Sequence, residues 1–281
     1  MQVRRYFNLT KASQLLIFAA ILLPMQALSQ NRFYVGTSLI AFDYTEFDDK
    51  DIFLDGEKGF IPGVILAWSH EKNHYFSEWQ GQFNYNQIKY DGQTQSGTPL
   101  IATSDAAILD THFKLGRNFN DDYGRSHALY MGVGYRYWYR NIRPSIDSQG
   151  NLVAGLLERY YWQYYLLGYG VKFQASQNTK VGLDFRLTKM VNAKMDVDFL
   201  GFKNYDNTQV DLGNKVGARL AVPIEIQMRR NSFFITPYYE IIDIGKSNSV
   251  RVTVDGVPIN TTIHEPRSET RNVGIEFTWG W

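Results

Sequence analysis

VGIEFTWGW, residues 273–281, is the most informative stretch of the chain. Every odd position in it is large and apolar, and every even position is small or polar. Because successive side chains of a β-strand point to opposite faces, the stretch predicts a strand with one strongly apolar face. An apolar face that ends in two tryptophans is typical of a strand that contacts lipid, with its aromatic rings at the membrane interface.

Two internal segments repeat this alternation over a greater length. In residues 181–197 the odd positions are mainly apolar and the even positions mainly polar, with only Lys189 and Met190 out of place. Residues 216–228 alternate over thirteen positions, with their charges on one face. A soluble strand has about 5–6 residues, whereas a tilted membrane strand needs about 9–11. The lengths therefore favour membrane strands.

Ten alternating segments predict the strands of the fold. They lie near residues 32–45, 59–69, 75–90, 105–119, 128–142, 158–174, 181–198, 215–229, 233–246 and 269–281. The intervals between them alternate in length, the short ones being 70–74, 120–127, 175–180 and 230–232 and the long ones 46–58, 91–104, 143–157, 199–214 and 247–268. Membrane barrels alternate short periplasmic turns with long external loops, and an even strand count leaves no open edge. We predict an all-β fold, a transmembrane antiparallel up-and-down β-barrel of about ten strands.

Residues 250–263 leave the strand count open. They alternate around Asp255-Gly256, a dipeptide typical of hairpin turns. This hairpin either extends above the membrane or adds two strands, which would make twelve. Its polar positions, such as Arg251 and Asn260, do not leave a clean lipid face. We therefore keep ten strands.

Residues 1–29 have the features of a secretory signal peptide. Basic residues precede the uncharged apolar run 15–23, and Ala27 and Ser29 provide small residues for cleavage. The run is much shorter than the ~20 apolar residues of a spanning helix, which argues against the alternative of an N-terminal anchor. We expect cleavage after Ser29, which leaves residues 30–281 as one barrel domain.

The composition excludes several classes of function. The 281 residues contain no cysteine, which excludes disulfides, thiolate zinc sites and cysteine nucleophiles. Lys and Arg number 29 against 28 Asp and Glu, without the basic excess of a nucleic-acid-binding protein. We expect no nucleic-acid partner, no metal and no cofactor.

The chain resembles the small outer-membrane β-barrel proteins of Gram-negative bacteria, the porin-like and OmpA-type barrels. The resemblance rests on the alternating C-terminal strand and on the segments 130–135, 167–171 and 239–245. It implies a multi-pass location in the outer membrane and contacts with outer-membrane lipid and lipopolysaccharide. It also implies recognition of the C-terminal strand by the barrel-assembly machinery, although the usual last residue is phenylalanine. The residues that would carry this assembly signal are Phe277, Trp279 and Trp281.

The ten-strand layout also resembles the omptin proteases, which use an Asp pair and an Asp–His pair at the external rim. The end of segment 181–198 offers Asp196 and Asp198 without a nearby histidine. Asp91 and Asp105, around the second long interval, lie far apart in sequence. Since the catalytic histidine has no match, the activity is not carried over.

His112 is the one histidine predicted to lie in mid-strand. Asp110 is two residues away, so both side chains are expected to face the lumen. A base oriented by a carboxylate is a fragment of many catalytic sites. Neighbours at i and i+2 on one strand more often form a structural pair, and no nucleophile can be placed beside them. We favour the structural interpretation.

Charged residues at even positions are predicted to point into the lumen. The principal candidates are Arg136, Arg140, Arg186, Arg219, Asp110, Asp184, Glu225, Glu240 and Glu276, and the same parity adds Lys114, Lys172, Lys194, Glu78, Glu158 and Asp196. Seven cations nearly balance eight anions, which favours ion pairs that plug the barrel over an open charged channel. Barrels of about eight strands are filled by side chains, whereas those of 16–18 leave open channels.

Aromatic residues cluster at 137–139 and 160–162, where two strands approach the external rim. We interpret them as part of the aromatic belt at the membrane interface rather than as a sugar-binding site.

These patterns predict a non-enzymatic outer-membrane barrel. It would act as a narrow or plugged porin-like channel or bind a ligand through its surface loops. One alternative is a barrel hydrolase at the external rim, either omptin-like or lipid-modifying. Another is a soluble periplasmic carrier of the lipocalin type.

Overall fold

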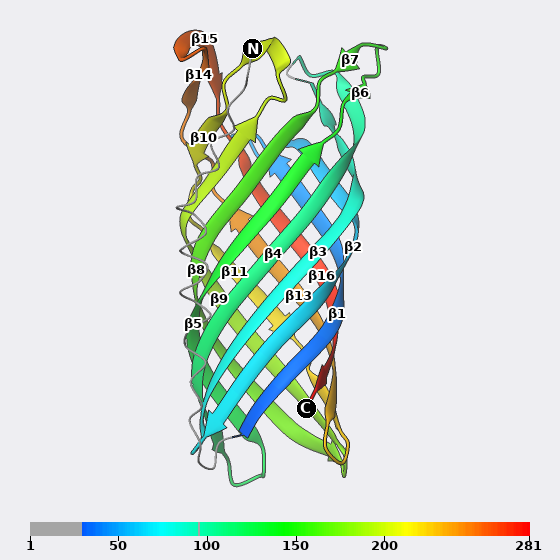
Figure 1. The fold of residues 1–281 in the computed structure, drawn as a ribbon, viewed down its shortest axis with the longest axis vertical. Coiled ribbons are helices and arrows are strands. Elements are labelled where there is room, and N and C mark those ends of the chain that lie inside the picture. The colour runs from blue at the N-terminus through cyan, green and yellow to red at the C-terminus, as the bar shows by residue number, and fades with distance from the viewer. Residues whose placement is uncertain (1–29, 95) are drawn as a thin grey trace, which may run out of the picture.

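The computed structural model describes residues 30–94 and 96–281, so the predicted signal peptide lies outside the described residues. Within these residues, twelve strand elements form one closed antiparallel barrel (Figure 1), and three of them are pieces of a single wall strand. The wall strands are β1 (Gln30–Phe47), β2 (Phe53–Lys72), β3 (Tyr75–Gln93), β4 (Pro99–Asn120), β5 (Ser126–Ile142), β8 (Leu156–Ser176), β9 (Thr179–Asp198), the interrupted strand β10, β11 and β12 (Thr208–Asp211, Val216–Ala221 and Ile224–Gln227), β13 (Ser232–Ile244) and β16 (Arg267–Gly280). The predicted up-and-down barrel of ten strands is confirmed.

The first and last strands close the barrel. β1 pairs with β16 in a register that places Leu39 opposite Ile275. The interrupted strand breaks at 212–215 and at 222–223, and the second break contains Pro223, which has no N–H to donate to the ladder. Its pieces nevertheless keep their pairing with β9 on one side, and β11 and β12 also pair with β13 on the other.

Two small hairpins stand at the end of the barrel opposite the C terminus (Figure 1). They are β6 (Ser145–Ile146) with β7 (Leu152–Val153), and β14 (Val250–Val254) with β15 (Val257–Ile263). The hairpin at 250–263 therefore extends beyond the wall and adds no strand to it. Among residues 30–94 and 96–281, no helix has the length and apolar character needed to cross a membrane.

The wall strands are longer than a membrane requires. β4 has 22 residues and β8 has 21, against the about 9–11 that span a bilayer. The first predicted long loop is largely strand, because β1 continues to Phe47 and β2 begins at Phe53. In barrels of this class the short turns face the periplasm, which assigns the end with β6, β7, β14 and β15 to the external side.

The outer wall is apolar toward the periplasmic end. Phe60 and Met131 are each 64% exposed and Val273 is 59% exposed, within a continuous set of outward apolar side chains. So large an exposed apolar surface is stable only against lipid. This part of the barrel is called the membrane half below. The soluble lipocalin-type carrier is thereby excluded.

The outer wall becomes charged toward the external end. Its ion pairs include Lys58–Asp43 (3.0 Å), Lys89–Asp91 (2.8 Å), Arg143–Asp105 (2.8 Å), Arg159–Asp198 (3.5 Å) and Arg271–Glu269 (3.1 Å). Charges at lipid-facing positions are costly, so this ring of pairs marks where the wall leaves the bilayer. The part of the barrel at and beyond the ring is called the external half.

Candidate functional site: the filled lumen

A bulge in β9 reverses which of its side chains face the lumen. Asn192 has a φ of 52°, and the register between β8 and β9 shifts beside it. Beyond it, Met195 and Val197 are buried inside the barrel. The prediction that Lys194 and Asp196 point into the lumen is wrong, because one extra residue in a strand inverts its parity. Both side chains lie on the outer wall.

The lumen layer nearest the periplasm is charged and paired. Its contacts are Lys114–Glu78 (2.8 Å), Arg219–Glu276 (2.6 Å), Tyr130–Asp184 (2.8 Å) and Arg32–Glu225 (4.0 Å). The structure thus places Asp184, Arg219, Glu225 and Glu276 inside the barrel, each with a partner of opposite charge or a hydroxyl donor.

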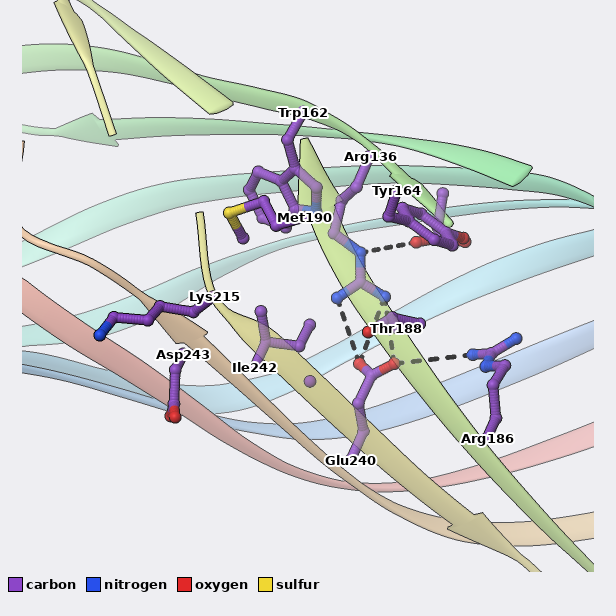
Figure 2. Close-up of a pocket in the computed structure, with 12 residues that line it drawn as sticks. Arg136, Trp162, Tyr164, Arg186, Thr188, Met190, Lys215, Glu240, Ile242 and Asp243 are labelled. Carbon is purple, nitrogen blue, oxygen red and sulfur yellow. Dashed lines mark hydrogen bonds and ion pairs between the residues drawn. The ribbon is translucent and has the colours of Figure 1, made fainter. Parts of the chain in front are cut away.

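Arg136 organises the middle layer of the lumen (Figure 2). Its Nε lies 2.6 Å from Asp110, and its terminal nitrogens donate to Glu240 at 3.2–3.3 Å. Arg186 lies 3.8 Å from Glu240, and Tyr164 donates to Asp110 at 2.8 Å. The cavity beside this network has a volume of about 20 Å³, which holds about one water molecule.

His112 belongs to the same layer. Its side chain is 6% exposed, and its Nδ1 lies 3.7 Å from Asp110 Oδ1, beyond hydrogen-bond distance. Asp110, which would have to orient the imidazole in a catalytic pair, is already bound by Arg136 and Tyr164. This arrangement favours the structural interpretation of the pair.

An apolar plug lies between the middle layer and the external end. Trp138, 2% exposed, stacks on Tyr160 with ring centroids 4.7 Å apart and meets Phe42 edge-on at 5.5 Å. Met195 and Trp162 belong to the same buried cluster. The prediction that Trp138, Tyr160 and Trp162 belong to the outer aromatic belt is wrong. The parity of the strands turns these three rings inward, and only their odd-numbered neighbours face outward.

Arg140 closes the lumen at the external end. It is 2% exposed and contacts Glu46 (2.9 Å), Asp55 (3.2 Å), Glu57 (2.9 Å) and Glu158 (2.7 Å). A fifth carboxyl group, that of Glu265, lies 2.9 Å from the Tyr44 hydroxyl and 2.8 Å from the Tyr160 hydroxyl. The ring of Tyr90 lies 5.7 Å from the guanidinium. Together these nine residues are called the Arg140 cluster.

Burial raises the pKa of three carboxyl groups in the Arg140 cluster, which lies outside the membrane-spanning part of the strands. They are those of Asp55, Glu158 and Glu265. Repulsion from Glu46 raises all three further, and Arg140 offsets only part of this effect. The folded protein therefore holds these protons to a higher pH than exposed carboxyl groups would.

Only part of the Arg140 cluster is predictable from the sequence. Strand parity places Arg140 and Glu158 in the lumen, but Glu46 and Glu57 fall in the expected loop 46–58. A signal was present, since Glu46 continues the even, inward parity of Ile40 and Tyr44.

The four aspartates considered for the external rim lie on the outer wall. Asp91, Asp105 and Asp198 are the carboxylates of three wall ion pairs, and Asp196 accepts a hydrogen bond from Tyr161 at 3.3 Å. Each is engaged by a partner of its own rather than directed into a shared site. Within residues 30–94 and 96–281, no group of three or more His, Asp or Glu side chains is arranged to hold a metal ion.

The C-terminal aromatic residues lie on the outer wall at the periplasmic end. Phe277 stacks on Phe233 at 6.5 Å between ring centroids, and Trp279 lies 6.3 Å from the same ring. Trp281 is 54% exposed. The position fits the interfacial belt of a membrane barrel.

Comparisons with known proteins support the fold. No protein family and no curated protein sequence matches the chain. Among solved structures, the outer membrane protease OmpT from Escherichia coli is similar with a TM-score of 0.60 and 9% identity, over 90% of this chain and 96% of that chain. The outer membrane protein OprG from Pseudomonas aeruginosa has a TM-score of 0.38 and 8% identity, over 89% and 93% of the two chains. The toluene transporter TodX from P. putida has a TM-score of 0.36 and 10% identity, over 89% of each chain. The likeness to OmpT shows that the chain has the fold of a bacterial outer-membrane barrel, consistent with a multi-pass position in that membrane.

Proposed function

We propose that this protein is a sealed, non-enzymatic outer-membrane barrel that acts by binding at its external surface rather than by passing solutes. The observation that carries this proposal is the filling of the lumen at successive levels. The ion-paired middle layer, the apolar plug and the Arg140 cluster follow one another along the barrel axis. A ten-strand barrel is narrow enough for side chains to fill it in this way.

The external hairpins supply the surface for binding. Leu152 on β7 is 80% exposed, and Ile146 on β6 and Val257 on β15 are each 64% exposed. These apolar side chains stand beyond the ring of wall ion pairs, where no lipid covers them. Exposed apolar tips on ordered hairpins favour contact with a protein or a ligand outside the cell.

The alternative of a hydrolase at the external rim has less support. The likeness to the protease OmpT is one of fold at 9% identity. The rim aspartates face away from the lumen and are engaged in wall contacts. A narrow channel is disfavoured by the same filling that supports the sealed barrel.

Single-channel conductance of the refolded protein in a planar bilayer tests the proposal. Folding is checked first by the mobility difference between unheated and heated samples on a detergent gel. We expect no discrete current steps from protein that is folded and inserted, while a porin inserted by the same procedure conducts. Steps from the folded protein would contradict a sealed lumen.

A further inference from the structure

The Arg140 cluster holds one cation among five carboxyl groups. The groups that face one another come from every element packed around it: Tyr44 and Glu46 on β1, Asp55 and Glu57 on β2, Tyr90 on β3, Arg140 on β5, Glu158 and Tyr160 on β8, and Glu265 just before β16. With every carboxyl group ionised, the cluster would carry four excess negative charges. Buried like charges at such distances repel strongly.

We propose that the Arg140 cluster is a proton-dependent clamp, which holds the external β14–β15 hairpin against the barrel mouth and releases it as the pH rises. The proposal goes beyond the binding function proposed above and does not depend on it.

The count of hydrogen atoms in the cluster supports this proposal. The hydroxyl of Tyr44 lies 2.8 Å from Glu46 and 2.9 Å from Glu265, and that of Tyr160 lies 2.8 Å from Glu265 and 3.3 Å from Glu158. Two hydroxyl groups supply two protons for these four oxygen–oxygen contacts. A carboxylate only accepts hydrogen bonds, so protons on the carboxyl groups would satisfy the remaining contacts.

One buried oxygen of the cluster lacks a hydrogen-bond donor among the residues that the structure describes. Glu57 is fully buried, and its Oε1 accepts a hydrogen bond from Arg140 at 2.9 Å, but its Oε2 has no hydrogen-bond partner within residues 30–94 and 96–281. A buried acceptor without a donor is destabilising. Loss of further protons from the cluster would add uncompensated charge beside it.

Glu265 connects the cluster to the hairpin. Its backbone N–H donates to the Ser247 hydroxyl at 2.7 Å, and its carbonyl oxygen accepts from the Ser247 N–H at 3.0 Å. These contacts close the base of the segment that carries β14 and β15. The side chain of Glu265 thus anchors the hairpin through Tyr44 and Tyr160.

The direction of the pH effect follows from the raised pKa of Glu265, which burial causes together with Glu46 and Glu158. A carboxyl group with a raised pKa in the closed state favours closure most below its ordinary pKa of about 4. That contribution is lost progressively as the pH rises through the raised value. The hairpin is therefore expected to be held most firmly at acidic pH and to loosen toward alkaline pH.

Hydrogen–deuterium exchange of the refolded full-length barrel between pH 5 and 9 tests the clamp. The readout is the protection of peptides from residues 246–266, corrected for the intrinsic pH dependence of exchange. We expect the protection to fall about tenfold for each unit by which the closed-state pKa exceeds that of the open state. Constant protection across this range would overturn the proposal.

Two variants sharpen this test. Glu265→Gln keeps an uncharged, hydrogen-bonding side chain and is expected to hold the hairpin closed at pH 9. Glu269→Gln removes a carboxylate paired with Arg271 on the outer wall and is expected to keep the wild-type pH dependence. An unchanged pH dependence in Glu265→Gln, or a hairpin that is open at every pH, would overturn the proposal. If Glu265→Gln does not fold, Glu158→Gln is measured in its place, and it is expected to weaken the pH dependence.

Discussion

The membrane half and the external half of this barrel have opposite polarity. In the membrane half the wall exposes residues such as Phe60 and Val273, and the lumen holds ion pairs such as Arg136–Asp110. In the external half the wall carries ion pairs, and the lumen holds the apolar plug around Trp138. The external half is thus built as a soluble barrel with an apolar core, continuous with a membrane barrel along the same strands.

β1 shows how one strand serves both environments. In the membrane half Leu39 faces lipid while Ser38 is buried in the lumen. Further along, Asp43 is on the outer wall while Phe42 and Tyr44 are buried inside. The alternation of direction is constant, but the polarity of each face changes where water replaces lipid outside. The polarity of the outward side chains therefore depends on whether lipid or water surrounds that part of the strand, and it changes along the strand.

The largest loss of stability is expected from a substitution in the Arg140 cluster of the external half. Arg140→Met leaves the surrounding carboxyl groups buried without a cation, and loss of one partner from a buried charge network costs about 3–5 kcal/mol. Urea unfolding of the protein in lipid vesicles, followed by tryptophan fluorescence, measures this loss. Arg143→Met removes a solvent-exposed outer-wall pair and is expected to cost much less than Arg140→Met. Equal losses in the two variants would mean that the Arg140 cluster is not a closed core.

On β9 beyond the bulge, truncating an inward side chain of the apolar plug is expected to cost far more stability than truncating an outward one. Met195→Ala removes a side chain that is 1% exposed, and such changes cost about 2–5 kcal/mol. Lys194→Ala, one position earlier on the outer wall, is expected to cost about 0.5 kcal/mol or less. The same unfolding measurement compares them. A greater loss from Lys194→Ala would contradict the inversion at Asn192.

The membrane half is more predictable from the sequence than the external half. Lipid on one side makes the period-2 alternation strong, so the strands and their number followed from segments such as 273–281. Beyond the bilayer, the clustering of aromatic residues led to Trp138 and Tyr160 being assigned to a lipid belt, although the alternation itself turns both rings inward. Aromatic residues suit both a membrane interface and a core, and composition alone does not distinguish the two.

The lumen-facing charges were likewise only partly predictable. Strand parity correctly predicted the inward direction of the charged residues at positions 136, 140, 186 and 240, because no bulge precedes them on their strands. The direction of Lys194 was predicted wrongly, since no clear sequence pattern indicates the bulge that precedes it. The sequence also did not predict which residues contact one another across the lumen. Arg140 and Glu46 come together only because β1 and β5 lie on the same closed barrel.

A positive charge added to the outer wall is expected to destabilise the membrane half much more than the external half. Ile275→Arg puts a cation among the lipid-facing residues and is expected to destabilise the inserted barrel by about 2–4 kcal/mol. Thr45→Arg puts the same charge on the outer wall of the external half and is expected to change stability by about 0.5 kcal/mol or less. Folding into vesicles across a urea series measures both. If Thr45→Arg is as costly as Ile275→Arg, lipid extends further up the wall than the ring of ion pairs indicates.

The smallest effect is expected from the ring of wall pairs itself. Lys58 and Asp43 lie 3.0 Å apart, but their side chains are 67% and 40% exposed, so water and salt screen the pair. Lys58→Gln is therefore expected to lower the unfolding free energy by about 1 kcal/mol or less, and raising the salt concentration should reduce the difference further. Urea unfolding at low and at high ionic strength measures both quantities. A loss of several kcal/mol that salt leaves unchanged would place this pair in a low-dielectric environment, and the boundary of the membrane half would then have to move outward past residue 58.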